Sequence, residues 1–119
     1  MVVDLLTSEA LSEPEADRVF QALADATRRD ILARAIVREE SVSALARGYE
    51  MSLTAVQKHV AVLERAALVS KQRSGREARV AANPETLRKA TTLLAAFEQL
   101  WIKRATKIAE ILAEEDAGT

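Results

Sequence analysis

The chain of 119 residues contains no cysteine, one histidine and only three glycines. Without cysteine it cannot form disulfides, thiolate metal sites or cysteine-based redox sensors. A single histidine also argues against a histidine-based metal site, so the sequence predicts no bound metal and no cofactor. Aromatic residues make up 3% of the chain, and their scarcity together with that of glycine favours a mainly helical protein.

Long apolar runs are missing as well. No run approaches the roughly 20 residues that a membrane-spanning helix needs. The N-terminal MVVDLL is too short and too acidic to resemble a signal peptide. We therefore expect a cytoplasmic protein without membrane contact. With 49% hydrophobic and 29% charged residues, the chain is typical of one folded domain with a substantial core.

The net charge of the chain is only −1, but the charges are unevenly distributed. Residues 1–25 contain one basic and six acidic side chains, a net charge of −5. Residues 26–79 contain eleven basic and six acidic side chains (+5), and residues 80–119 contain five and six (−1). A basic middle segment is what the electrostatic footprint of a nucleic-acid-binding surface requires.

The most informative stretch is 51–68, MSLTAVQKHVAVLERAAL. Ser52 is a predicted N-cap, and the apolar residues that follow recur at steps of three and four, which predicts one buried helix face: Leu53, Val56, Val60 and Leu63. The rest of the helix carries small residues and hydrogen-bond donors, which suit the major groove of DNA. The predicted DNA-binding residues are Ser52, Thr54, Ala55, Gln57, Lys58 and His59. The alternative is an ordinary amphipathic surface helix. For His59 we expect a packing or phosphate-contact role and not that of a catalytic base or pH sensor, because no nucleophile constellation and no second histidine accompany it.

The segments before this helix are predicted to form an arm and three further helices. Residues 1–13 are expected to form a loose or partly helical arm, followed by a helix over about 14–24. A second helix over 28–38 is predicted to start from Thr27 and to bury Ile31, Leu32, Ala35 and Ile36. Its projecting arginines are Arg28, Arg29, Arg34 and Arg38, for which phosphate contact, solvation and ion pairing all remain open. A short third helix opens at 41–43 and ends near Gly48, which completes a helix-turn-helix unit.

A predicted β-hairpin follows directly. Residues 68–73 and 77–82 read as strands around a Ser74–Gly75 turn, and a helix-turn-helix joined to a basic hairpin is a winged helix. Its predicted DNA-binding residues are Lys71, Arg73, Arg76 and Arg79. The alternative is a hairpin whose charges only improve solubility.

Three motifs resemble the ArsR family of bacterial winged-helix repressors. FQALADATRRDIL at 20–32 resembles the opening signature of this family, AVQKHV at 55–60 its recognition-helix motif, and AALV at 66–69 its entry into the wing. The resemblance covers about residues 18–83 and implies a homodimeric regulator that binds a roughly palindromic operator. The chain departs from the family at Gln57, where Ser is common, at Ala67, where Gly is common, and at Val80 and Ala82, where an aromatic residue is common.

The resemblance also bears on metals. Metal-sensing members carry Cys-x-Cys at the start of the third helix, where this chain has Ser41 and Ser43. Hydroxyls lack the soft, easily ionised sulfur that holds such metals, so we expect both serines to cap the helix. A second family site needs His on the C-terminal helix, which has none. The chain thus resembles the metal-independent branch, and no inducer is identified.

A last helix is predicted from Pro84, capped by Asn83, to about Ala113. Its apolar stripe continues for nearly four heptads, longer than one small domain covers from one side, which favours packing against a second copy. The predicted dimer interface is Phe20, Leu87, Leu94, Phe97, Trp101, Ile108 and Leu112. The alternative is a helix folded back on its own core.

Together these patterns predict a mainly α protein with a small β-hairpin, divided into an arm (1–13), a winged helix-turn-helix (14–83) and a dimerisation helix with its tail (84–119). The predicted function is a repressor that binds a double-stranded DNA operator as a homodimer. A winged helix that binds a protein partner is the alternative. An enzyme or carrier is disfavoured, because no paired carboxylates, nucleophile constellation or phosphate loop appear, and no catalytic residue is predicted.

Overall fold

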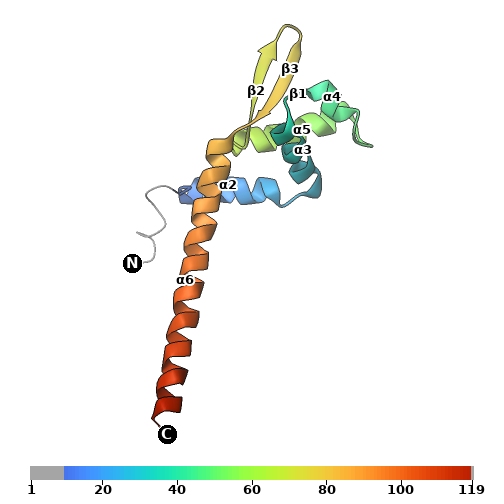
Figure 1. Ribbon diagram of the computed structural model, residues 1–119. Helices are drawn as coiled ribbons and strands as arrows, with labels where there is room; N and C mark the ends of the chain where they lie inside the picture. Colours follow the sequence, from blue (N-terminus) through green and yellow to red (C-terminus); the bar gives the residue numbers. More distant parts are fainter. Residues whose placement is uncertain (1–9, 119) are drawn as a thin grey trace.

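The computed structural model describes residues 10–118 as a helical body with two projections (Figure 1). The elements are α2 (Glu13–Leu23), α3 (Ala26–Val37), β1 (Glu40–Ser41), α4 (Val42–Ala46), α5 (Leu53–Arg65), β2 (Val69–Ser74), β3 (Glu77–Ala82) and α6 (Pro84–Ala117). The β2–β3 hairpin leaves the body on one side and α6 on the other, so the molecule measures 75 × 29 × 20 Å. The predicted winged helix-turn-helix with a long C-terminal helix is confirmed.

Most helices begin where a side chain can cap them. Ser12, Ser41, Ser52 and Asn83 each accept a hydrogen bond from a backbone N–H in the first turn of the following helix. The predicted cap at Thr27 is wrong. Asp25 caps α3 instead, since its carboxylate accepts from the N–H of Arg28 at 3.0 Å. This hydrogen bond lowers the pKa of Asp25.

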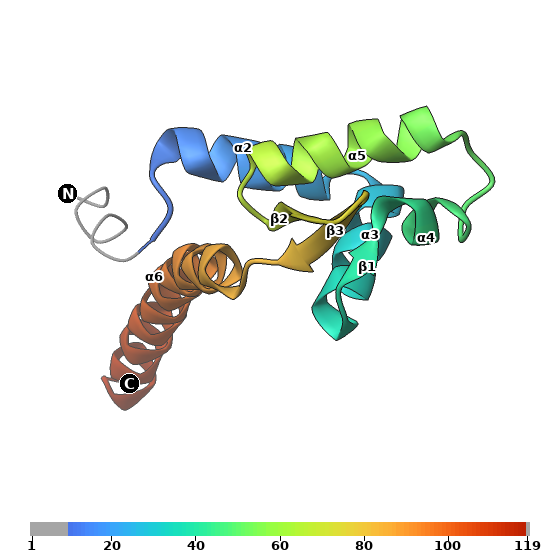
Figure 2. The same ribbon diagram turned by 90° about the horizontal axis from the view of Figure 1, so that it is seen from above.

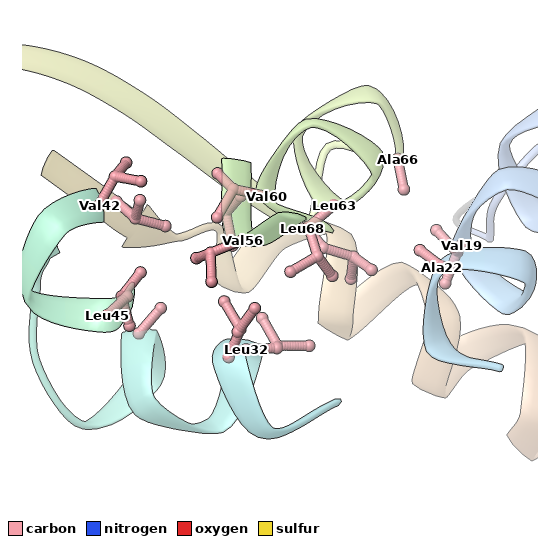
Figure 3. Close-up of a cluster of buried hydrophobic side chains, with 14 of the residues drawn as sticks. Val19, Ala22, Leu32, Val42, Leu45, Val56, Val60, Leu63, Ala66 and Leu68 are labelled. Carbon is pink, nitrogen blue, oxygen red and sulfur yellow. The ribbon is translucent and has the colours of Figure 1, made fainter. Parts of the chain in front are cut away.

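The core lies between α5 and the other helices of the body (Figure 3). The fully buried face of α5 consists of Val56, Val60 and Leu63, and it packs in one cluster with these residues of the preceding elements: Leu11, Val19, Ala22, Ile31, Leu32, Ala35, Val42 and Leu45. Leu11 lies in the predicted arm but is 5% exposed, which corrects that assignment for the part of the arm that the structure describes. Residues 1–9 of the arm lie outside the described range.

Two predicted core residues are wrong. Ile36 is 54% exposed, because it lies on the flank of the α3 stripe and near the end of that helix. Leu53 is 47% exposed, because it is the first residue of α5 and borders the open space beside the hairpin. Both residues fit the three-to-four spacing, but spacing alone does not show where the covering elements end.

The connection from α5 to the hairpin requires a special backbone conformation. Ala67 has a φ of 59°, a left-handed conformation that costs a residue with a Cβ roughly 1–2 kcal/mol. The carbonyl of Ala67 accepts from Thr86 Oγ1 at 2.6 Å, and the Leu68 carbonyl accepts from the Asn83 N–H at 2.9 Å. The start of α6 is therefore fastened to this turn. The positive φ also explains why glycine suits this position in the family that the sequence resembles.

The sheet contains a strand that the sequence did not reveal. The strand order is β1-β3-β2, and both pairs are antiparallel. Strand β1 has only two residues, with Glu40 opposite Val80 and Ser41 opposite Arg79. Two residues are too few for an alternating pattern, so only the hairpin was predicted. Strand β1 joins the wing to the start of α4.

Among the described residues, helix α6 contacts the body only in its N-terminal part. Its buried residues are Thr86, Ala90 and Leu93, and every described side chain from Trp101 onward is exposed. The helix ends at Ala117, one turn later than predicted. Within residues 10–118, no helix combines the length and apolar character needed to cross a membrane.

Candidate nucleic-acid interface

Helix α5 turns a polar surface away from the core. Thr54, Gln57 and Lys58 are exposed, whereas Ala55 is half-buried. Ser52 stands at the N-terminus of the helix, where its hydroxyl accepts from the Ala55 N–H at 3.1 Å. The three exposed side chains can donate or accept hydrogen bonds without disturbing the core. This is the arrangement that base and phosphate contacts in a groove require.

His59 lies between the helices rather than on the open surface. It is half-buried, and its Nδ1 lies 3.3 Å from Nη1 of Arg28. The same guanidinium donates to the carbonyls of Ala22 (2.7 Å) and Gln21 (3.0 Å) at the end of α2. Arg28 thus connects α2, α3 and α5, and His59 has the packing contact that the sequence allowed. A DNA contact of His59 stays a prediction.

The turn between α4 and α5 is held by a polar cluster. Tyr49 donates its hydroxyl to Asp30 at 2.5 Å, and the guanidinium of Arg34 lies 5.4 Å from the centre of the Tyr49 ring. Arg34 also donates to the Leu45 carbonyl at 3.3 Å and pairs with Glu40 at 2.7 Å. Partial burial, together with the hydrogen bond to Asp30, raises the pKa of Tyr49. Arg34 is therefore a structural ion-pair residue, one of the roles left open for it, and it connects α3 with β1, α4 and the turn after α4.

The predicted wing residues lie on two faces of the hairpin. Lys71 and Arg73 follow buried Val69 at steps of two along β2 and therefore lie on the same face of the hairpin as Val69. Arg79 lies on the opposite face, because the adjacent Val80 is buried. Its guanidinium donates to the Glu39 carbonyl at 3.2 Å and lies 3.6 Å from the Glu77 carboxylate. Arg79 is therefore separated from the other wing cations and fastens β3 to the segment before β1.

A hollow of about 420 Å³ separates α5 from the wing. Its lining combines polar groups of α4 and α5 with cations of the wing: Val42, Ser43, Leu53, Gln57, Val60, Lys71, Arg73, Arg76, Glu77 and Ala78. Lys71 has a 3.8 Å ion pair with Glu64, whereas Arg73 and Arg76 have no ion pair within residues 10–118. Glu77 is the one acidic residue in the lining, and its carboxylate lies 3.6 Å from Arg79. The hollow therefore presents hydrogen-bonding groups beside a net positive charge, which suits a polyanion.

Comparisons with known proteins place the chain in a family. No protein-family model matches it. The HTH-type transcriptional regulator Rv2034 of Mycobacterium tuberculosis is 35% identical over 103 residues, which cover 87% of this chain and 94% of that protein. The solved structure of an ArsR-like transcriptional regulator from Rhodococcus sp. RHA1 is 34% identical, covers 82% of this chain and 92% of its own, and superposes with a TM-score of 0.75. The chain belongs to the ArsR family of winged helix-turn-helix transcriptional regulators.

A more distant ArsR-like structure supports the fold alone. The homodimeric winged helix-turn-helix DNA-binding domain Mb0332 of Mycobacterium bovis is 22% identical and has a TM-score of 0.60. It covers 77% of this chain and 92% of its own. The family resemblance predicted from the motifs at 20–32 and 55–60 is confirmed by the two relatives of 35% and 34% identity.

The ArsR-family metal position has a different chemistry in this chain. Ser41 accepts from the Ala44 N–H at 3.1 Å and caps α4, as predicted. Ser43 does not cap, since it lies inside α4 and faces the hollow beside the wing. Among residues 10–118 no group of three or more His, Cys, Asp or Glu side chains could hold a metal ion.

Proposed function

We propose that this ArsR-family protein is a transcriptional repressor that binds a palindromic double-stranded operator as a homodimer. Helix α5 enters the major groove, and the β2–β3 wing lies on the flanking DNA. One observation carries the proposal. The hollow between α5 and the wing brings Gln57 into the same surface as Lys71, Arg73 and Arg76. One side of that surface can read bases while the other binds backbone.

The side chains divide into two roles. Gln57 and Thr54 have short polar heads that can reach base edges from α5, and a glutamine amide pairs well with adenine. Lys58, Arg73 and Arg76 carry charge at the ends of longer side chains, which suits phosphate oxygens. Ser52 and Ala55 have small side chains, which leave room for the N-terminus of α5 to approach the groove closely.

The dimer is supported by the exposed part of α6. Leu94, Phe97, Trp101, Ile108 and Leu112 are each at least 47% exposed, although they form one apolar stripe. An exposed stripe of this length is typical of a surface that a second copy covers. Helix-turn-helix proteins use such pairs to reach two half-sites about one helical turn apart. Phe20, 39% exposed on α2, and the half-buried Leu87 extend the proposed interface.

Salt dependence tests DNA binding directly. Lys and Arg that contact phosphates release condensed counterions, so the logarithm of the binding constant should fall linearly with log salt, by about 0.9 per neutralised phosphate. The +5 charge of residues 26–79 motivates this expectation. The measurement is fluorescence anisotropy of a labelled duplex between roughly 50 and 200 mM salt. A flat line would contradict DNA binding and favour the protein-binding alternative.

A further inference from the structure

A second basic hollow lies on the other flank of α5, away from the wing. It has a volume of about 300 Å³ and is lined by Arg18 and Gln21 of α2, Arg28 of α3, and Val62 and Arg65 of α5. Helices α2 and α5 lie side by side around it (Figure 2). Three guanidinium groups from three helices meet here, and no carboxylate is among the lining residues.

Arg28 supplies a fixed guanidinium. It uses Nε for the Ala22 carbonyl, Nη2 for the Gln21 carbonyl and Nη1 for His59. An arginine has five N–H donors, so two remain. These contacts hold the group in place before any ligand binds, which reduces the entropy that binding would otherwise cost.

Arg18 and Arg65 complete the hollow from two sides. Neither has a hydrogen bond or an ion pair within residues 10–118. Three cations and no carboxylate line the hollow, so its positive charge would attract an oxyanion. Guanidinium forks match the oxygens of phosphate, to which they donate paired hydrogen bonds.

The position of the hollow on α5 indicates which molecule would supply such an oxyanion. Lys58 and Arg65 are seven residues apart and therefore lie on the same face of α5, so the hollow continues the surface proposed to meet DNA. Arg18 and Phe20 are two residues apart on α2 and project to opposite flanks. The basic hollow is thus separate from the surface around Phe20 that is assigned to the partner copy.

We propose that Arg18, Arg28 and Arg65 form a phosphoryl-binding site that holds a phosphate of the DNA backbone at the C-terminal end of α5. This inference rests on the proposed function. The wing hollow and this second hollow lie on opposite sides of α5, so phosphates bound in both would fix the tilt of the helix in the groove. The three arginines position the protein and read no sequence.

The test uses Arg18→Gln, Arg65→Gln and the double variant, with Lys103→Gln as matched control. Lys103 is exposed on α6 and loses the same charge far from the hollow. Affinities for a selected duplex and for a random duplex are measured across salt. Each arginine variant should weaken both duplexes by the same factor and reduce the steepness of the salt slope by about 0.9. The double variant should show about twice this change, and Lys103→Gln none.

A second arm separates backbone phosphate from free phosphate. Inorganic phosphate is titrated into the wild type and the double variant while the arginine Nε–H signals are followed by NMR. The Arg28 signal is present in both proteins. A saturable shift of this signal that occurs in the wild type and vanishes in the double variant indicates a site for free phosphate as well, and salt-slope changes without such a shift indicate the DNA backbone alone. Unchanged slopes together with absent shifts, in variants with wild-type circular dichroism, would overturn the inference.

The two proposals fail in different ways. In the first case, the DNA affinity of the wild type falls steeply with salt, the arginine variants behave like Lys103→Gln, and phosphate shifts no arginine signal. The phosphoryl site is then wrong and the proposed function stands. If the wild type does not bind DNA but phosphate shifts the arginine signals saturably, the site is correct and the proposed function is wrong.

Discussion

Trp101→Glu is expected to convert the proposed dimer into a monomer of 13.0 kDa and to lower operator affinity by about 100-fold or more. Trp101 is 66% exposed at the centre of the α6 stripe. A carboxylate at this place would be desolvated in the apolar contact of the dimer, a cost of several kcal/mol that a pair with the neighbouring Arg104 offsets only in part. The contact area of the indole would also be lost. A monomer binds only one half-site, so it loses the gain in affinity from two linked half-sites.

The control for this variant is Gln99→Glu. Gln99 is also exposed and lies two residues earlier, on the opposite face of α6, and its replacement adds the same charge. Light scattering after size exclusion should give a dimer mass for Gln99→Glu and a monomer mass for Trp101→Glu. Circular dichroism should match in both, because the buried contacts of α6 end before this position. A Trp101→Glu protein that remains a dimer with normal affinity would show that the stripe is not the interface.

Gln57→Ala and Arg76→Ala are expected to affect DNA binding in different ways. Gln57 faces the hollow from α5, and loss of a good base contact costs about 1–3 kcal/mol of specific binding, or roughly 5- to 150-fold. The affinity of the Gln57→Ala variant for random DNA should change little. Arg76 lies at the hairpin turn beside Gly75, so Arg76→Ala should weaken specific and random binding together and flatten the salt slope by about one unit.

Paired titrations on a selected and a random duplex measure this difference. Both side chains are exposed, so thermal unfolding and dimer mass should equal those of the wild type. Equal losses on both duplexes for Gln57→Ala would mean that α5 only positions the protein, with specificity residing elsewhere.

The elements that could be predicted are those whose local signals agree. Ser52 and Asn83 cap α5 and α6 as expected, since a capping side chain acts within one helical turn. The buried face of α5 followed from the spacing of Val56, Val60 and Leu63. The exposed stripe around Trp101 followed from an apolar pattern too long for the body to cover. Each of these features is determined by residues that are close in sequence.

The features that could not be predicted depend on contacts between distant residues. Strand β1 exists because Glu40 and Ser41 meet β3, about 40 residues later. From the sequence alone, phosphate contact was equally possible for Arg28 and Arg34. Only the packing of α3 shows that Arg34 pairs with Glu40 and that Arg28 contacts His59 on α5. The same limit applies to the hollow of Arg18, Arg28 and Arg65, which is assembled from three helices.

Selection from a random double-stranded DNA library tests the central claim most directly. The full-length protein is used to enrich bound duplexes, and the number of chains on the selected duplex is then measured by native mass spectrometry. We expect an inverted repeat whose half-sites are centred about 10–10.5 base pairs apart, or a multiple of this distance, with two chains bound. Enrichment of no common sequence, or of a single half-site that binds one chain, would contradict the proposal that α5 reads a palindromic operator in a homodimer.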